Sequence, residues 1–130
     1  MTRLLVAFVL LAAWLPASGW QEPPPPPQLK VVRAAARRVG SRLQVDGTVK
    51  NVAGRPLRRL TLRFEFLSSG RDIVTARKAQ LEEARIDPGE ESSFSYELND
   101  EPRAVRFRIS ASDAKDEVLR IVAPGPYPIQ

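Results

Sequence analysis

The ten residues from Arg42 to Asn51, RLQVDGTVKN, alternate between apolar or small side chains and polar ones without a break. This period of two predicts a β-strand with one face in a core and the other in solvent. The face predicted to be buried carries Leu43, Val45, Gly47 and Val49. Because a strand with one apolar face must be covered by another layer, the segment favours a layered β-structure.

Three further segments repeat the alternation: Leu60–Phe66 (LTLRFEF), Ser93–Leu98 (SFSYEL) and Ala104–Ala111 (AVRFRISA). In the last two, the residues predicted to point inward are Phe94, Tyr96, Leu98, Val105, Phe107, Ile109 and Ala111. Weaker strands are expected at Leu29–Arg38, Ile73–Gln80 and Glu117–Val122. The alanines at 34–36 are also compatible with a helix, and Leu81–Arg85 with a single helical turn.

Turns that contain glycine separate these segments. Val39–Ser41, Asn51–Pro56 and Ser68–Asp72 each contain a glycine at which we expect positive φ. The sequence DPGE at Asp87–Glu90 is typical of a type II turn with Gly89 in the left-handed position. About seven short strands joined in this way predict an all-β fold, a single antiparallel sandwich of the immunoglobulin-like or fibronectin type III-like kind.

Residues 1–19 have the features of a signal peptide. Arg3 precedes the apolar run Leu4–Leu15, and cleavage is predicted after Gly19. The run has 12 residues, whereas a membrane-spanning helix needs about 20, and no cysteine follows it for lipid attachment. A retained anchor is the alternative. We therefore expect an exported protein, periplasmic or secreted, with no stable membrane span after cleavage of the signal.

Proline-rich segments flank the predicted domain. Residues 20–28 form a predicted linker in which Pro23–Pro27 favour a stiff polyproline helix. The sandwich domain is expected to cover residues 29–123. Because proline lacks an amide donor, residues 124–130 are expected to be an irregular tail.

The pattern of Val45, Gly47, Val49 and Asn51, followed by Pro88, Gly89, Glu90 and Phe94, resembles the FxLYD-type and related bacterial immunoglobulin-like domains. The motif after which that family is named is matched only in part: Phe64, Glu65 and Phe66 correspond to F-x-L, but Leu67 and Ser68 stand where tyrosine and aspartate are expected. The resemblance extends from about Leu29 to Val122. It implies an exported accessory or adhesion-type module with no catalytic residues.

The composition excludes several kinds of chemistry. The chain has no cysteine and no histidine, so disulfides, thiol catalysis, cysteine-ligated zinc and an imidazole base are all absent. The sequence SDAK at Ser112–Lys115 matches the S-x-x-K of serine penicillin-recognising enzymes, but their partner motifs are missing. The adjacent acidic pairs, such as Glu82 with Glu83, do not have the spacing of a calcium loop. We expect no catalytic site, no metal site and no cofactor.

Charge is unevenly distributed along the chain. Lys30–Gln80 contains 13 Lys and Arg against 3 acidic residues, whereas Leu81–Gln130 contains 6 against 11. In a fibronectin-like topology the third predicted strand, Leu60–Phe66, lies beside the sixth, Val105–Ile109. The outward residues of these strands, Arg59, Arg63, Arg106 and Arg108, are therefore predicted to form one basic surface, with Arg77 and Arg120 at its margins.

This arginine surface has two interpretations. In the first it binds carboxylates, phosphates or sulfates of an anionic polymer or of another envelope protein. In the second the arginine stems cover apolar sheet surface and pair with Glu65, Thr61 and Glu117 across strands. Specific nucleic-acid binding is not expected, because the aromatic residues are predicted to point inward and leave no stacking platform.

The sequence therefore predicts a non-catalytic exported module. A binding domain in the bacterial envelope is the first hypothesis, and a structural or accessory envelope domain without a ligand of its own is the second.

Overall fold

A computed structural model describes residues 25–130, and this part of the chain contains ten β-strands and no helix. The strands are β1 (Leu29–Val39), β2 (Arg42–Asn51), β3 (Leu57–Arg58), β4 (Thr61–Leu67), β5 (Ile73–Gln80), β6 (Arg85–Ile86), β7 (Glu91–Asn99), β8 (Arg106–Ser112), β9 (Ile121–Val122) and β10 (Tyr127–Pro128). The predictions of a signal peptide at 1–19, and of most of the linker at 20–28, lie outside the described residues. No helix long and apolar enough to cross a membrane is found within residues 25–130.

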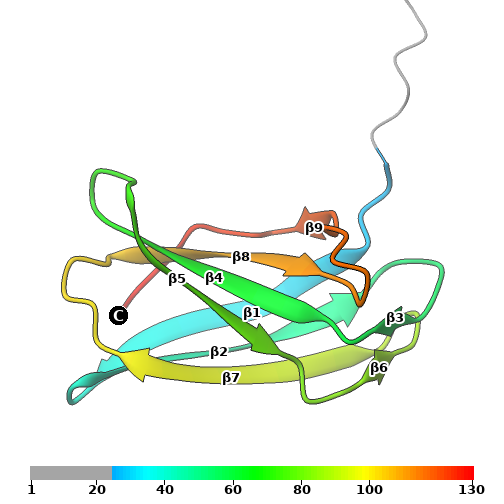
Figure 1. Cartoon of the computed structure of the whole chain (residues 1–130), viewed down its shortest axis with the longest axis horizontal. Coiled ribbons are helices and arrows are strands. Elements are labelled where there is room, and N and C mark those ends of the chain that lie inside the picture. Colours follow the sequence, from blue (N-terminus) through cyan, green and yellow to red (C-terminus); the bar gives the residue numbers. More distant parts are fainter. Residues whose placement is uncertain (1–24) are drawn as a thin grey trace, which may run out of the picture.

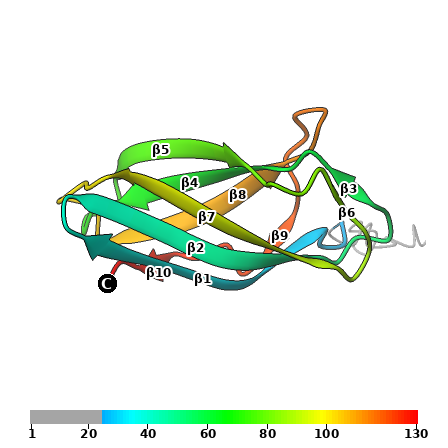
Figure 2. The same cartoon turned by 90° about the horizontal axis from the view of Figure 1, so that it is seen from below.

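The strands form two four-stranded sheets that face each other, with a short ribbon at one end (Figures 1 and 2). The first sheet has the order β7-β2-β1-β9 and the second sheet the order β10-β8-β4-β5, while β3 and β6 form the ribbon. All pairings between strands are antiparallel except β1 with β9. The predicted all-β sandwich is therefore confirmed, as is the adjacency of the third and sixth predicted strands, here β4 and β8.

The core lies between the inward faces of the two sheets. Phe64 of the second sheet packs against Phe94 and Tyr96 of the first, with ring centroids 5.6 and 5.7 Å apart. Gly47 lies beneath Phe94: a Cβ atom at this position would come within 2.6 Å of the Phe94 ring and 2.2 Å of the Arg33 carbonyl oxygen. The predicted inward face of Arg42–Asn51 is thus confirmed, and its glycine is required by close packing.

A register shift in β1 explains why the sequence of this strand does not distinguish clearly between a strand and a helix. The pairing with β2 slips between Val31 and Arg33, so that Val32 forms a β-bulge. Before the bulge Leu29 and Val31 are buried, and after it the inward positions are Ala34 and Ala36. The change from odd to even positions breaks the period of two. The alanines at 34–36 belong to a strand and not to a helix.

The prediction of an irregular tail at residues 124–130 is wrong. β10 pairs with β8, and Ile129 forms a bridge to Ala36 of β1. Proline lacks only the donor, so the Pro124 carbonyl accepts from the Ile109 amide at 2.8 Å. The two residues after Pro128 still donate: Ile129 N to Val105 O and Gln130 N to Ala36 O, both at 2.9 Å. The tail therefore joins the two sheets along one side of the sandwich.

Smaller differences concern short elements. Leu81–Arg85 forms no helical turn, and its last residue begins β6. The strand expected at Glu117–Val122 is reduced to β9 and a single bridge from Val118 to Ser112. Val105, expected inward, is 39% exposed because it precedes β8, while Ala104 is buried instead.

The expected positive φ is found at Gly40 and Gly89 but at neither Gly54 nor Gly70. In the turn Ser68–Asp72 it is Arg71 that adopts φ 67°.

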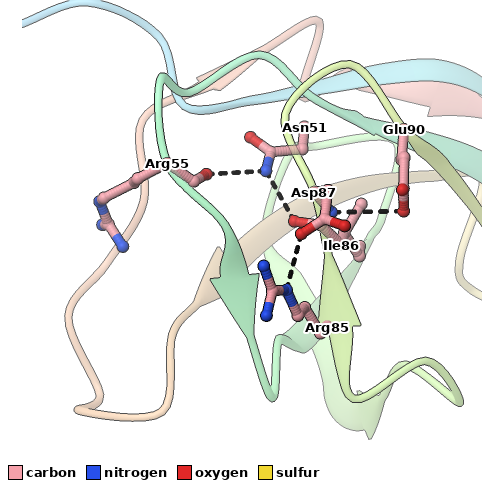
Figure 3. A network of polar contacts seen from close by, with 6 residues as sticks. All are labelled: Asn51, Arg55, Arg85, Ile86, Asp87 and Glu90. Carbon is pink, nitrogen blue, oxygen red and sulfur yellow. Dashed lines mark hydrogen bonds and ion pairs between the residues drawn. The ribbon is translucent and has the colours of Figure 1, made fainter.

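The buried side chain of Asn51 organises the end of the sandwich that carries the ribbon (Figure 3). Its Nδ2 donates to the carbonyl oxygens of Arg55 and Ile86 at 2.9 and 2.8 Å, and its Oδ1 accepts from the Ala53 amide at 2.8 Å. Its backbone carbonyl accepts from Gly89 of the turn before β7. The asparagine of the sequence pattern thus has a structural role, since it connects the loop before β3, strand β6 and the turn before β7.

Candidate functional site

On the outer face of the second sheet, side chains of neighbouring strands lie in rows, and the pairing of the strands shows which residues share a row. Lys78 of β5, Arg63 of β4 and Ser110 of β8 lie side by side across three strands. In the next row Ala76, Glu65 and Arg108 are neighbours, and beyond them Leu67 pairs with Arg106. Because side chains alternate along a strand, these residues lie on the side opposite the core residues Leu62, Phe64 and Phe66, and all of them except the buried Leu67 are at least partly exposed to solvent.

Three of the four predicted site residues are brought together on this face: Arg63, Arg106 and Arg108. Arg59 is not among them. The chain adopts φ 49° at Arg59, outside β4, and the Arg59 amide donates to Ala84 O at 2.9 Å, which places it beside the β3–β6 ribbon. The sequence predicts that Arg59 and Arg63 point to the same face of one strand. The left-handed backbone at Arg59 ends this regular alternation before β4 begins.

The two marginal arginines also lie elsewhere. Arg77 pairs with Phe64 and so occupies the opposite face of β5, where it donates to Thr75 Oγ1 at 2.6 Å. Arg120 immediately precedes β9, which belongs to the first sheet.

Glu65 is the acidic residue in the rows of this face. Its Oε2 accepts from Arg108 Nη2 at 2.9 Å, and its side chain is 15% exposed against 48% for Arg108. The hydrogen bond to Glu65, and then the charge of that carboxylate, raise the pKa of Arg108 above its usual value. The expected pairing of an arginine with Glu65 is therefore present, but it neutralises only one of the cations.

The remaining cations on this face make no ion pair with any residue in 25–130: this holds for Arg63, Lys78 and Arg106. Arg63 and Lys78 are directly opposed across β4 and β5, and like charges in such positions destabilise a sheet. On the outer face of the first sheet, by contrast, Arg33 pairs with Asp46 and Arg42 with Glu97, each at 3.0 Å. Unpaired cations therefore lie next to one another on the second sheet.

Two hollows flank the Glu65–Arg108 pair. One of about 300 Å³ is lined by Thr61, Arg63, Lys78, Ser110, Ala111, Ser112, Asp116 and Val118. The other, of about 330 Å³, is lined by Leu67, Ser68, Arg71, Arg106, Arg108 and Pro126. The first combines two cations and the carboxylate of Asp116 with hydroxyl groups, and the second combines three guanidinium groups with apolar side chains.

Sequence reasoning missed Lys78 and Arg71. Lys78 lies in a strand whose inward and outward positions are obscured by a register shift opposite Phe66 and Leu67. Arg71 lies in a hairpin, where periodicity gives no direction. The position of Gly70, one residue before the left-handed position, was the only available sign of an unusual turn.

Within the described part of the chain, no group of three acidic side chains is arranged to hold a metal ion. The adjacent acidic residues Glu82 with Glu83 and Glu90 with Glu91 are exposed, and Asp100, next to Glu101, pairs with Arg38 at 2.9 Å. What the outer face of the second sheet offers chemically is a set of hydrogen-bond donors with permanent positive charge.

No protein-family model and no curated protein matches the chain. Among solved structures, a calcium-binding mutant of Bacteroides uniformis β-glucuronidase 2 has a TM-score of 0.52 at 20% identity, over 72% of this chain. Bacteroides uniformis β-glucuronidase (TM-score 0.51, 17% identity) and a β-glucuronidase from glycoside hydrolase family 2 (TM-score 0.51, 9% identity) match the same share of the chain. The matched regions cover only 14%, 14% and 12% of those proteins. At these identities the likeness shows the fold alone.

Proposed function

We propose that this protein is an exported, non-catalytic immunoglobulin-like or fibronectin type III-like module that binds an anionic partner through the second sheet. The partner is another envelope protein with an acidic surface or an anionic polymer. The binding surface comprises Arg63, Lys78, Arg106 and Arg108. We refer to these four residues as the basic face.

The opposed pair Arg63 and Lys78 is the observation that carries the proposal. Neighbouring cations without an acidic partner reduce the stability of the free protein, and a bound anion would remove that cost while it gains hydrogen bonds from the guanidinium group. The first sheet supplies a useful contrast: Lys30 also opposes Lys50, but Lys50 has Glu91 as its neighbour on the other side.

A non-catalytic role is supported by three observations. The chain has no histidine or cysteine, and the described residues hold no cluster suited to metal chemistry. In addition, the similar regions of the β-glucuronidases are small parts of much larger proteins, which is consistent with a domain that accompanies other functions.

The alternative, a structural envelope domain without a ligand, is favoured by the Glu65–Arg108 pair. In that case the arginines of the second sheet would act through cross-strand pairing and by covering apolar surface with their stems.

A charge-matched comparison tests the basic face. We expect the double variant Arg63→Ser with Lys78→Ser to bind immobilised dextran sulfate at least about tenfold more weakly than the native protein at low ionic strength. The control is Lys30→Ser with Lys50→Ser, which removes the same charge from the first sheet. Equal weakening in both variants would indicate unspecific attraction by net charge, and the proposal would fail.

Export rests on the sequence of residues 1–19. We expect protein recovered from the cell envelope or the medium to begin at Trp20, as N-terminal sequencing would show. A chain recovered with Met1 intact would support the retained anchor instead.

A further inference from the structure

We propose, on the basis of the function proposed above, that the hollow between the β4–β5 hairpin and the C-terminal tail is a specific site for a phosphate or sulfate monoester with an apolar body. We call this hollow the arginine pocket. Its lining residues are Leu67, Ser68, Arg71, Arg106, Arg108 and Pro126. The function proposed above concerns anions in general. The present proposal names a class of ligand and adds Arg71, which is not part of the basic face.

Three separate elements build the pocket. Arg106 and Arg108 alternate on β8 and point to the same side. Arg71 comes from the hairpin that follows β4, and Pro126 from the tail that pairs with β8. The volume of about 330 Å³ suits a small organic anion.

The charges favour a tetrahedral anion. Three guanidinium groups line the pocket, and only Arg108 has an acidic partner, Glu65. A single guanidinium satisfies both oxygens of a carboxylate through a bidentate pair. A phosphate or sulfate group presents three oxygens, so it can accept from several guanidiniums at once, and a dianionic phosphate balances the two arginines that Glu65 does not neutralise.

The apolar lining favours an ester over a free inorganic anion. Pro126 is exposed and supplies carbon surface beside the guanidinium groups, next to the edge of the nearly buried Leu67. Apolar surface removed from water on binding contributes to affinity in proportion to its area. The organic part of an ester can cover this surface, which inorganic phosphate cannot do.

The backbone at Arg71 supports a role in binding. The Arg71 amide donates to Ser68 O and the Ser68 amide to Asp72 O, both at 2.9 Å, so the hairpin fixes Arg71 at φ 67°. This position normally takes glycine, because a side chain there is strained. Strained residues of this kind concentrate at functional sites.

A larger hollow of about 530 Å³ lies between the loops at the other end of β4. Its charged lining residues are Arg55, Arg58, Lys115, Asp113 and Glu117. The acidic and basic groups there nearly balance, so the hollow offers no comparable preference for an anion.

The variant Arg71→Gly distinguishes binding from structure, and Arg59→Gly is its matched control. Both replace an arginine at positive φ, and both are expected to raise the Tm by about 2–6 °C. Only Arg71→Gly should weaken the binding of phenyl phosphate, by at least about tenfold. Titration followed by NMR should show shifts concentrated on Leu67, Ser68, Arg71, Arg106 and Arg108.

The choice of probes tests the ligand class. Phenyl phosphate and phenyl sulfate should bind more tightly than inorganic phosphate and than benzoate, by about tenfold or more. Vesicles that contain phosphatidic acid carry the same monoester on a lipid. Binding of phenyl phosphate alone identifies a soluble ester, and Arg71-dependent binding of the vesicles identifies a membrane lipid. Binding of neither overturns the proposal.

The outcomes separate the two proposals. If dextran sulfate binding depends on Arg63 and Lys78 but phenyl phosphate does not bind, the basic face stands and the arginine pocket fails. If phenyl phosphate binding requires Arg71 while both double variants bind dextran sulfate equally well, the general anion-binding face fails and the pocket remains. If Arg71→Gly and Arg59→Gly reduce phenyl phosphate binding alike, the pocket assignment is wrong.

Discussion

At the scale of single residues, Asn51 shows how a buried polar side chain can determine the course of several loops. An amide side chain has donors and an acceptor, and here it donates to two carbonyl groups and accepts from one amide. No protein side chain of the same shape offers this combination. The loop before β3 and the turn between β6 and β7 therefore both depend on one residue.

We predict that Asn51→Asp lowers the free energy of unfolding by about 3 kcal/mol or more. The carboxylate keeps the shape of the side chain but turns acceptor oxygens toward the carbonyl groups of Arg55 and Ile86. Urea denaturation followed by circular dichroism measures the change. The control is Asn99→Asp, because Asn99 Oδ1 accepts from Arg42 Nη1 at 2.8 Å on the surface and a carboxylate preserves that bond. A loss below about 1 kcal/mol for Asn51→Asp would contradict the assigned role.

At the scale of elements, the tail is the clearest departure from the sequence-based prediction. Tyr127 packs on Phe107 with ring centroids 5.5 Å apart, and its hydroxyl donates to the Ala123 carbonyl oxygen. Partial burial raises the pKa of the Tyr127 hydroxyl. The prolines at 124, 126 and 128 leave alternate positions free to donate, so a proline-rich segment can still serve as an edge strand.

We predict that a chain ending at Ala123 loses about 4 kcal/mol of stability, because Phe107 is uncovered and the hydrogen bonds to β8 and β1 are lost. Thermal unfolding gives the measurement. The substitution Pro128→Ala keeps these contacts and should cost less than about 1 kcal/mol. If the shortened chain were as stable as the full one, the tail would have no structural role.

The long alternating strands could be predicted because period and burial agree in them, as in Arg42–Asn51. The bulge at Val32 could not, because its insertion reverses the parity within an otherwise plausible strand. For the candidate site, three of four arginines were placed correctly on one face, since β4 and β8 are neighbours in the predicted topology. Arg59 and Arg71 were misjudged or missed because their left-handed backbones depend on turn geometry, which the local pattern does not encode.

At the scale of the whole molecule, the two sides of the sandwich differ. On one side the tail connects β8 with β1. On the other, β5 and β7 are the long edge strands of their sheets. β7 buries Ser92, Phe94 and Leu98, whereas no residue of β5 is fully buried. The second sheet should therefore open most readily at β5.

We predict that amides of β5 that are hydrogen-bonded to β4 exchange with solvent earlier than those of β7 bonded to β2, measured by hydrogen exchange and NMR. Both are edge strands, so the comparison isolates the effect of burial. The central strands β2 and β4 should be protected longest. Exchange that is equally slow in β5 and β7 would argue against local opening at β5.

The pairing of residues 124–130 with both sheets also has a consequence during synthesis of the chain. The strand that joins the layers is translated after every other strand described here, so a nascent chain lacks the contacts of Ile129 and Gln130 with Ala36 until these residues have left the ribosome. Until then Phe107 lacks the cover of Tyr127, and the nascent chain has the lower stability predicted above for a chain that ends at Ala123.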